Sequence, residues 1–340
     1  MSLLFMESAD HQAAAQMTRK WTSMSGAAIV PGLHGNGWTA TTCRMGLVFG
    51  NDVIQFGCAM KFASLGCVIL SMADGGVTTQ HQVTVQQDGS VVGNRFTGAA
   101  TQLFLTAPDL IKTGQWYYIE YQALVHATLG TIQLRVNGIE FINLTGLNTT
   151  GVTFDGVLRS FAMSDASAVT HDDLIVMDTV DDGLDDPRWP SGGGGFDQFL
   201  GQIEIIVKRP NGAGFKAEFV PNTGANWQNV DDTTPDDDTT YNACAAADVG
   251  DEDIHEFEDL AVGEDILGAQ HLVCSRKTEE GIASLKPIIR QDGVNFEGDE
   301  LGVNEDYYYV NRVVHASAPD GTLWSKAKFD AIQAGYTREQ

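Results

Sequence analysis

The sequence has few cysteines and no long hydrophobic run, and each shortage excludes a class of protein. Its five cysteines are widely spaced, without a Cys-x-x-Cys pair, which argues against a disulfide framework and against a zinc knuckle. No stretch approaches the roughly 18 apolar residues of a membrane-spanning helix. The first residues, MSLLFM, lack the positive charge and apolar length of a signal peptide. We therefore expect synthesis in a cytoplasm and no membrane insertion.

Basic residues are also scarce, and the imbalance lies almost entirely in one part of the chain. Residues 1–150 hold 8 acidic and 7 basic side chains, whereas residues 151–340 hold 37 acidic and 13 basic ones. The formal net charge is −25. A negative field of this size repels phosphate backbones, so direct binding to nucleic acid is not expected. The simplest role for the charge is solubility.

Common catalytic motifs are missing too. The chain contains no Gly-x-Ser-x-Gly elbow, no Walker loop, no Gly-x-Gly-x-x-Gly and no His-Glu-x-x-His. Its eight histidines are scattered, without the close spacing of a metal site. On this basis the sequence predicts a protein that is not an enzyme and needs no cofactor.

The most informative stretch that is present covers residues 115–138. Apolar and aromatic residues alternate with polar ones in YIEYQALV and again in IQLRV, which is typical of strands with one buried and one solvated face. Asn137-Gly138 then supplies two residues that tolerate positive φ, as a tight type I′ hairpin requires. This pattern predicts an antiparallel β-sandwich.

Short strand-like segments with glycine-rich turns continue through most of the chain, which favours an all-β sandwich or jelly roll. We place a first domain at residues 1–210 and a smaller, acidic, β-rich domain at residues 211–340. The segment Phe199–Arg209 is expected to form a strand that returns to the first domain, and Lys326–Gly335 is expected to form a helix. The expected strands are Asp52–Phe62, Cys67–Ala73, Gln80–Gln87, Ser90–Val92, Thr101–Leu105, Val157–Met163, Leu174–Asp178, Ala269–Ser275, Ile282–Ile289 and Tyr307–His315.

Three segments together resemble the concanavalin A-like, laminin-G-type jelly roll: residues 114–120 (GQWYYIE), residues 135–138 (RVNG) and residues 171–178 (HDDLIVMD). The opening LLFMES, the Lys20-Trp21 that follows it and the late DGTLWS are similar to virion proteins of tailed bacteriophages that carry this domain. The resemblance covers about residues 1–210.

This resemblance implies a non-enzymatic structural subunit of a phage particle, in a tail, tail-tip, fibre-base or head-decoration position. It would act by docking to other virion proteins and form a symmetric homo-oligomer. The acidic half would then face solvent or a basic partner. One alternative is a carbohydrate-binding module for host adhesion, which would grip a surface glycan.

A second alternative is a glycoside hydrolase of the same jelly-roll superfamily. The segment DEDIHE, from Asp251 to Glu256, approaches the Glu-x-Asp-x-x-Glu pattern of glucanases in that superfamily, in which the outer carboxylates act as nucleophile and acid/base. Apolar residues recur every three positions from Ile254, which predicts a short helix or an irregular edge in place of a catalytic strand. The sequence therefore disfavours this alternative.

Two kinds of binding residue stand out. Trp189, Trp227 and Tyr308 are aromatic side chains that could stack on a sugar ring or anchor an interface. Core packing is the competing interpretation for the tyrosine, which belongs to a Tyr-Tyr-Tyr run. An acidic loop offers the hard oxygen ligands that calcium prefers, although a solvated loop is the favoured interpretation: Asp181, Asp182, Asp185 and Asp186. Asp173 is expected to accept backbone hydrogen bonds from a neighbouring turn.

Overall fold

The computed structural model describes residues 2–49, 52–74, 78–151, 154–164, 168–178, 199–261, 265–315 and 317–340, without the side chains of residues 2, 164 and 308–314. The chain divides into two compact units. The first consists of Met1–Asp10 and Ala14–Ile205, and the second of His11–Ala13 and Ile206–Gln340. No helix among the described residues is long and apolar enough to cross a membrane.

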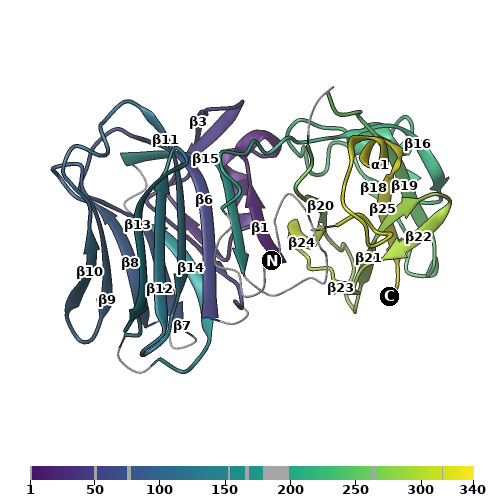
Figure 1. Ribbon diagram of the computed structural model, residues 1–340. Helices are drawn as coiled ribbons and strands as arrows, with labels where there is room; N and C mark the ends of the chain where they lie inside the picture. The colour runs from purple at the N-terminus through teal and green to yellow at the C-terminus, as the bar shows by residue number, and fades with distance from the viewer. Residues whose placement is uncertain are drawn as a thin grey trace. The chain divides into compact units, whose positions relative to one another are not determined.

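The first unit is a sandwich of two antiparallel sheets, sheet A and sheet B (Figure 1). Sheet A contains, in spatial order, β13 (Ile139–Leu147), β12 (Gly130–Val136), β11 (Trp116–Leu124), β6 (Val53–Phe62), β15 (Val169–Asp178), β4 (Asn36–Thr39) and β3 (Ala28–Pro31), and β1 (Ser2–Glu7) pairs with β15. Sheet B contains β10 (Ala100–Leu105), β9 (Val91–Phe96), β8 (Thr79–Val85), β7 (Cys67–Asp74), β14 (Leu158–Ser164), β5 (Thr42–Gly46) and β2 (Ser23–Ser25). Two 3-10 helices, η1 (Ala9–His11) and η2 (Ala14–Arg19), follow β1.

The chain passes repeatedly from one sheet to the other. It leaves sheet A after β6, builds four strands of sheet B, returns for β11 to β13, and then places β14 in sheet B and β15 in sheet A. As a result β6 pairs with β11 and β15, which lie far from it in the sequence. This wrapping confirms the predicted all-β, concanavalin A-like jelly-roll sandwich.

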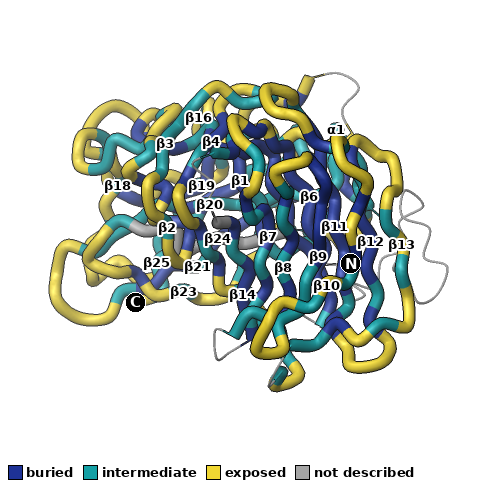
Figure 2. Tube along the Cα trace, turned by 90° about the vertical axis from the view of Figure 1, so that its left-hand side faces the viewer, coloured by how far each residue is buried: buried dark blue, intermediate teal, exposed yellow. Residues whose placement is uncertain are grey.

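The core of the first unit lies between the two sheets and is rich in aromatic rings. Trp21 meets the edge of Phe5 with ring centroids 5.0 Å apart, and it also contacts Phe161 at 5.7 Å. Tyr121 carries its hydroxyl into the same interior, where it lies 2.7 Å from Nε2 of His81. In Figure 2 the colour of buried residues follows β6, β11 and β12. The inward residues of the alternating pattern are thus the core residues that the sequence predicts.

The hairpin between β12 and β13 confirms the predicted turn. Asn137 and Gly138 have φ values of 52° and 76°, which are the left-handed conformations of a type I′ turn. The Asn137 side chain also accepts a hydrogen bond from the Tyr118 amide at 2.8 Å. The turn therefore fixes the register of three neighbouring strands, because it binds back onto β11.

The second unit is also built from strands. Its main sheet, sheet C, contains β16 (Pro210–Ala217), β19 (Glu252–Phe257), β25 (Gln333–Arg338), β21 (Ser284–Gln291) and β22 (Val294–Glu297), with β23 (Leu301–Gly302) beside β21. Two smaller pairs are β17 (Val220–Pro221) with β18 (Asn242–Ala243), and β20 (Ala269–Ser275) with β24 (Tyr308–His315). The short helices are η5 (Asn226–Asn229) and α1 (Lys326–Ala331).

The predicted helix at Lys326–Gly335 is half correct. Ser325 caps α1 by accepting the Lys328 amide, as the sequence allows, but the helix ends at Ala331. The next residues form β25, which is inserted between β19 and β21. Propensity alone does not reveal this change, because the partners of β25 come from distant parts of the chain.

Candidate functional site

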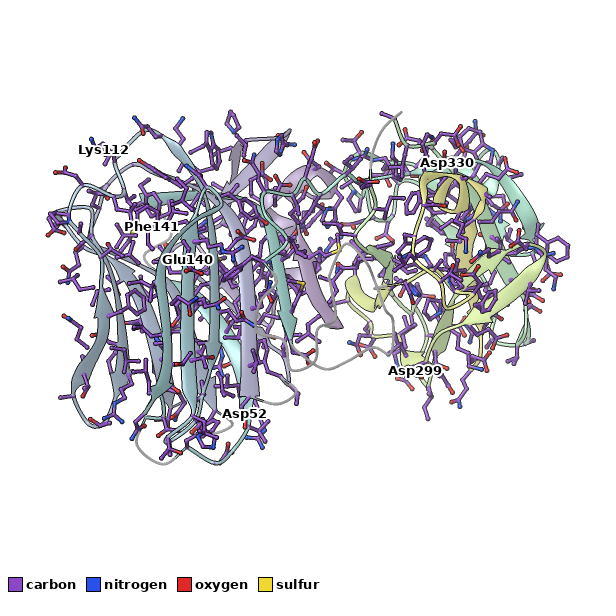
Figure 3. All side chains as sticks on the ribbon, in the orientation of Figure 1. Asp52, Lys112, Glu140, Phe141, Asp299 and Asp330 are labelled. Carbon is purple, nitrogen blue, oxygen red and sulfur yellow. The ribbon has the colours of Figure 1, made fainter. Side chains whose placement is uncertain are left out.

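Two rows of polar side chains cross the outer face of sheet A, which is the face directed away from the core. Strand pairing sets the members of each row side by side. The first row consists of amides from β6 to β13: Gln55, Gln122, Gln133 and Asn143. The second row is charged and runs from β11 to β13: Glu120, Arg135 and Glu140. Figure 3 labels Glu140, the member on the edge strand.

The sequence predicts that this face is solvated, and the structure contradicts that prediction for the central strands of the face. Tyr118, Glu120 and Gln122 each have an exposed fraction of 2%, and Gln133 has 8%. Alternation correctly separates the two faces, but it cannot show that other parts of the chain cover the polar one. The result is a polar surface that is buried on β6 and β11 and at Gln133 of β12, and exposed at Glu140 and Asn143 on the edge strand β13.

Several polar atoms of this surface have no hydrogen-bond partner within the described part of the chain. They are the Tyr118 hydroxyl, Oε2 of Glu120, Oε1 of Gln122, Oε1 of Gln133 and Nε of Arg135. Leaving a buried polar group unpaired costs about 1–3 kcal/mol, and folded proteins contain few such groups. Five of them on one face is a cost that core packing does not explain.

A segment without regular secondary structure, residues 199–205, forms part of the cover. The Gly201 amide donates to Oε1 of Glu120 at 2.7 Å, and the Arg135 guanidinium lies 4.8 Å from the centre of the Phe199 ring. We call residues 199–205 the strap. It belongs to the first unit and crosses the outer face of sheet A from β12 to β15.

The strap corrects the expected strand at Phe199–Arg209. The segment does return to the sandwich, but residues 199–209 contain no strand. The Ile205 amide donates at 2.7 Å to Oδ1 of Asp173, so its partner is a side-chain carboxylate. Because carboxylates receive the amides of Gly201 and Ile205, these two bonds belong to no strand ladder, and the segment lies over the face of the sheet.

The far end of the strap meets a cluster that holds the β3–β4 turn. Asp172 accepts the amides of Leu33 and His34 on Oδ2, at 2.8 and 2.9 Å. Asp173 places Oδ2 2.6 Å from Nδ1 of His34 while its Oδ1 accepts the Ile205 amide. Both carboxylates are buried, whereas about a third of the His34 side chain is exposed. Asp173 does accept a backbone amide, as predicted, but that amide belongs to Ile205 of the strap. The amides of the β3–β4 turn are accepted by the preceding residue, Asp172.

Backbone geometry at this cluster is strained. Asp173 has a φ of 49°, in a region that non-glycine residues rarely adopt. It lies where the pairing of β15 with β6 shifts, between Asp172 and Ile175. The shift turns two successive carboxylates to the β3–β4 turn and the strap, and a regular strand would send them to opposite faces.

Burial sets the ionisation of the cluster and of the face. Burial, together with the neighbouring Asp173 carboxylate, raises the pKa of Asp172 to about 7. Burial also raises the pKa of Asp173 and of Glu120, although each accepts a strap amide that favours its charged form. Burial lowers the pKa of His34, but the hydrogen bond and charge of Asp173 outweigh it, so the net shift is upward. These groups therefore hold protons more readily than ordinary side chains.

Most of the binding residues chosen from the sequence are not tested by the structure. Trp189 and the four calcium candidates, Asp181, Asp182, Asp185 and Asp186, lie outside the described residues. Trp227 is half-buried in η5, in the second unit. Tyr308 begins β24, and its side chain is not described. These choices stay predictions.

The acidic motif from Asp251 to Glu256 lies mainly in β19, which contradicts the expected helix or irregular edge. β19 is paired on both sides, with β16 and β25, and its register with β25 is regular. Because side chains alternate along a regular strand, Asp251 and Asp253 share one face and Glu256 points from the other. The two outer carboxylates therefore cannot act on one glycosidic bond from these positions.

Asp253 has a structural role in the second unit. Its carboxylate is fully buried and accepts the side-chain amides of Asn226 and Asn242, at 3.0 and 2.8 Å. Burial raises its pKa to about 6. The network ties η5 and β18 to β19.

One group in the second unit has metal-ligand geometry among the described residues. Donor atoms of Cys244, Asp248 and Asp251 all lie within 4.8 Å of one another. Burial raises the pKa of the Cys244 thiol to about 11, which opposes the thiolate that a metal would require. The two carboxylates are at the surface or half-buried, so the group has the properties of an ordinary acidic surface.

No protein-family model matches the chain, and no curated protein matches it. Solved structures that are similar include an endo-β-1,4-glucuronan lyase from the fungus Trichoderma reesei, with a TM-score of 0.39, 12% identity, and coverage of 52% of this chain and 96% of that one. A Caenorhabditis elegans galectin, LEC-6, has a TM-score of 0.30 and 13% identity, covering 39% and 88%. The CBM40 of a Ruminococcus gnavus IT-sialidase has a TM-score of 0.31 and 13% identity, covering 43% and 92%.

These matches correct one prediction. The sequence predicts that the chain is not an enzyme, but the proteins with similar structures include a lyase, so this prediction is contradicted. The likenesses concern the fold alone and assign no reaction to this chain. They also include no phage protein among those reported, so the phage part of the sequence resemblance is without support.

Proposed function

We propose that the chain recognises a glycan through the outer face of sheet A. The proposal rests on one observation, the five buried polar atoms on this face that have no hydrogen-bond partner within the described part of the chain. A sugar carries many hydroxyl groups, and each can both donate and accept. A bound glycan would therefore offer partners to amide, carboxylate, hydroxyl and guanidinium groups at once.

The spacing of the rows also suits an extended ligand. Neighbouring strands lie about 4.8 Å apart, so the amides of Gln122, Gln133 and Asn143 form a ladder across three strands. Such a ladder repeats at a distance close to the length of one sugar unit. The face is covered in this structure, so binding would require at least the strap to move.

This proposal replaces the virion subunit expected from the sequence, because neither the described face nor the matched structures favour that role. It develops the alternative of carbohydrate recognition. The expected partners, which are other virion proteins and further copies of this chain, stay predictions. So does the expected location in a virion.

The test is a glycan array followed by calorimetry on the oligomers that bind. Gln122→Leu removes an amide from the proposed face at similar volume, and we expect an affinity loss of roughly tenfold or more. Gln82→Leu on β8 is the matched control, since Gln82 lies half-buried on sheet B. The proposal fails if the wild-type protein binds no glycan, or if the control loses as much affinity as the Gln122 variant.

A further inference from the structure

The charges around the outer face of sheet A are predominantly negative. Arg135 is the only cation of the second polar row, and strand pairing places it between Glu120 and Glu140. Lys61 lies on the same face but four residues beyond Gly57 on β6, or about 13 Å along the strand from the row that contains Glu120. The one basic side chain within the row is thus already flanked by two carboxylates.

The strap end of the face adds more acids. Asp172 and Asp173 are buried there, and Glu204 of the strap acts electrostatically on Asp173 and on His34. His34 is the nearest base, and its Nδ1 is bound to Asp173. Among the described residues of the charged row and of this strap end, the cations are therefore Arg135, which lies between two carboxylates, and His34, which is bound to Asp173; Lys61 lies outside both.

The strap shows which kind of group the face binds. Its two amide contacts, from Gly201 and Ile205, place N–H donors on the carboxylates of Glu120 and Asp173. A ligand that displaces the strap must supply donors at the same positions. Hydroxyl and amino groups can do this, whereas a uronate or sialate carboxylate brings only acceptors and a like charge.

We infer that the ligand is a neutral or amino-bearing glycan, and that the face excludes acidic glycans. The inference rests on the proposed function, since it assigns the ligand class of the same site. It names Glu120 and Asp173 as the residues that determine specificity. Neither is assigned a catalytic role.

The experiment compares polyuronate oligomers with their carboxyl-reduced forms, which keep the linkage and stereochemistry and lose only the charge. Polyglucuronate, polymannuronate and polygalacturonate oligomers, each with its reduced form, and a chitosan oligomer are titrated against the full chain by calorimetry. We expect at least one reduced form or the chitosan oligomer to bind. An acidic form should bind at least about tenfold more weakly than its reduced counterpart. This gap should narrow in about 1 M salt.

Glu120→Gln is the decisive variant, because glutamine keeps an oxygen for the Gly201 amide and removes the negative charge. This substitution should reduce severalfold the difference in affinity between an acidic oligomer and its carboxyl-reduced form. Asp88→Asn, at a turn of sheet B, is the matched control and should leave the gap unchanged. Tighter binding of an acidic form to the wild-type protein would overturn the inference but leave the proposed function standing. Binding of no oligomer of any kind would instead overturn the proposed function.

Discussion

Two tyrosines on β11 should respond to the same substitution with opposite signs. Tyr118 points to the outer face, where its buried hydroxyl has no hydrogen-bond partner among the described residues. The Ile203 amide faces this hydroxyl but does not reach hydrogen-bond geometry. Tyr121 points into the core and places its hydroxyl 2.7 Å from Nε2 of His81. The two side chains are thus almost equally buried, but only the Tyr121 hydroxyl has a hydrogen-bond partner among the described residues.

The magnitudes follow from that difference. Tyr118→Phe removes an unsatisfied group that costs about 1–3 kcal/mol, so we expect the free energy of unfolding to rise by about 1 kcal/mol after allowance for a small packing defect. Tyr121→Phe removes a satisfied group and leaves both ring nitrogens of His81 without partners, since its Nδ1 already has none among the described residues. We expect that variant to lose about 1–3 kcal/mol.

The measurement is hydrogen exchange of the β6 and β11 amides in the full chain, which reports the opening free energy of the first unit without requiring one transition for both units. Glycan binding by the same variants supplies a second test, because Tyr118→Phe should weaken binding while it stabilises the fold. A loss of stability in Tyr118→Phe as large as that in Tyr121→Phe would refute the reasoning. It would show that the outer-face hydroxyl is satisfied, and one of the five polar atoms that support a ligand on this face would no longer do so.

Three further predictions concern the first unit. In the folded protein the pKa of Asp172 is about 7, above its ordinary 3.8, so the folded state binds this proton more tightly and loses stability as the pH rises through that window. Relative to Asp172→Asn, the wild-type protein should therefore lose up to about 4 kcal/mol of unfolding free energy between pH 4 and pH 8, as measured by denaturant titration. Lys20→Met takes the ammonium from a buried ion pair with Glu7, 3.5 Å away, and should cost about 3 kcal/mol in the same titrations; unchanged stability would contradict the pairing. Gly93→Ala would place a methyl group 2.0 Å from the Phe104 ring, so its melting temperature should drop by several degrees, and Phe104→Leu should rescue part of that loss.

Local patterns determined much of the first unit. The alternation in residues 115–138 fixed which side chains enter the core, and Asn137-Gly138 fixed the hairpin, because both depend on neighbours in the sequence. The same alternation assigned Gln122, Gln133 and Arg135 to the opposite face. The assignment to that face is correct, but the expected exposure to solvent is wrong for Gln122 and Gln133, which are buried. A strand pattern carries no information about which segments cover the strand.

Only the tertiary structure decided the candidate site. The polar rows exist because β6, β11, β12 and β13 pair with one another, and the paired residues lie up to 71 positions apart in the sequence, as Val53 and Leu124 do. The strap covers the face because its amides bind Glu120, which periodicity assigned to an ordinary strand, and Asp173, which was expected to accept amides of a neighbouring turn. In the second unit, the motif from Asp251 to Glu256 became a strand with its acids on opposite faces. Composition and spacing specify each segment, but the burial of a polar group depends on segments that only folding brings together.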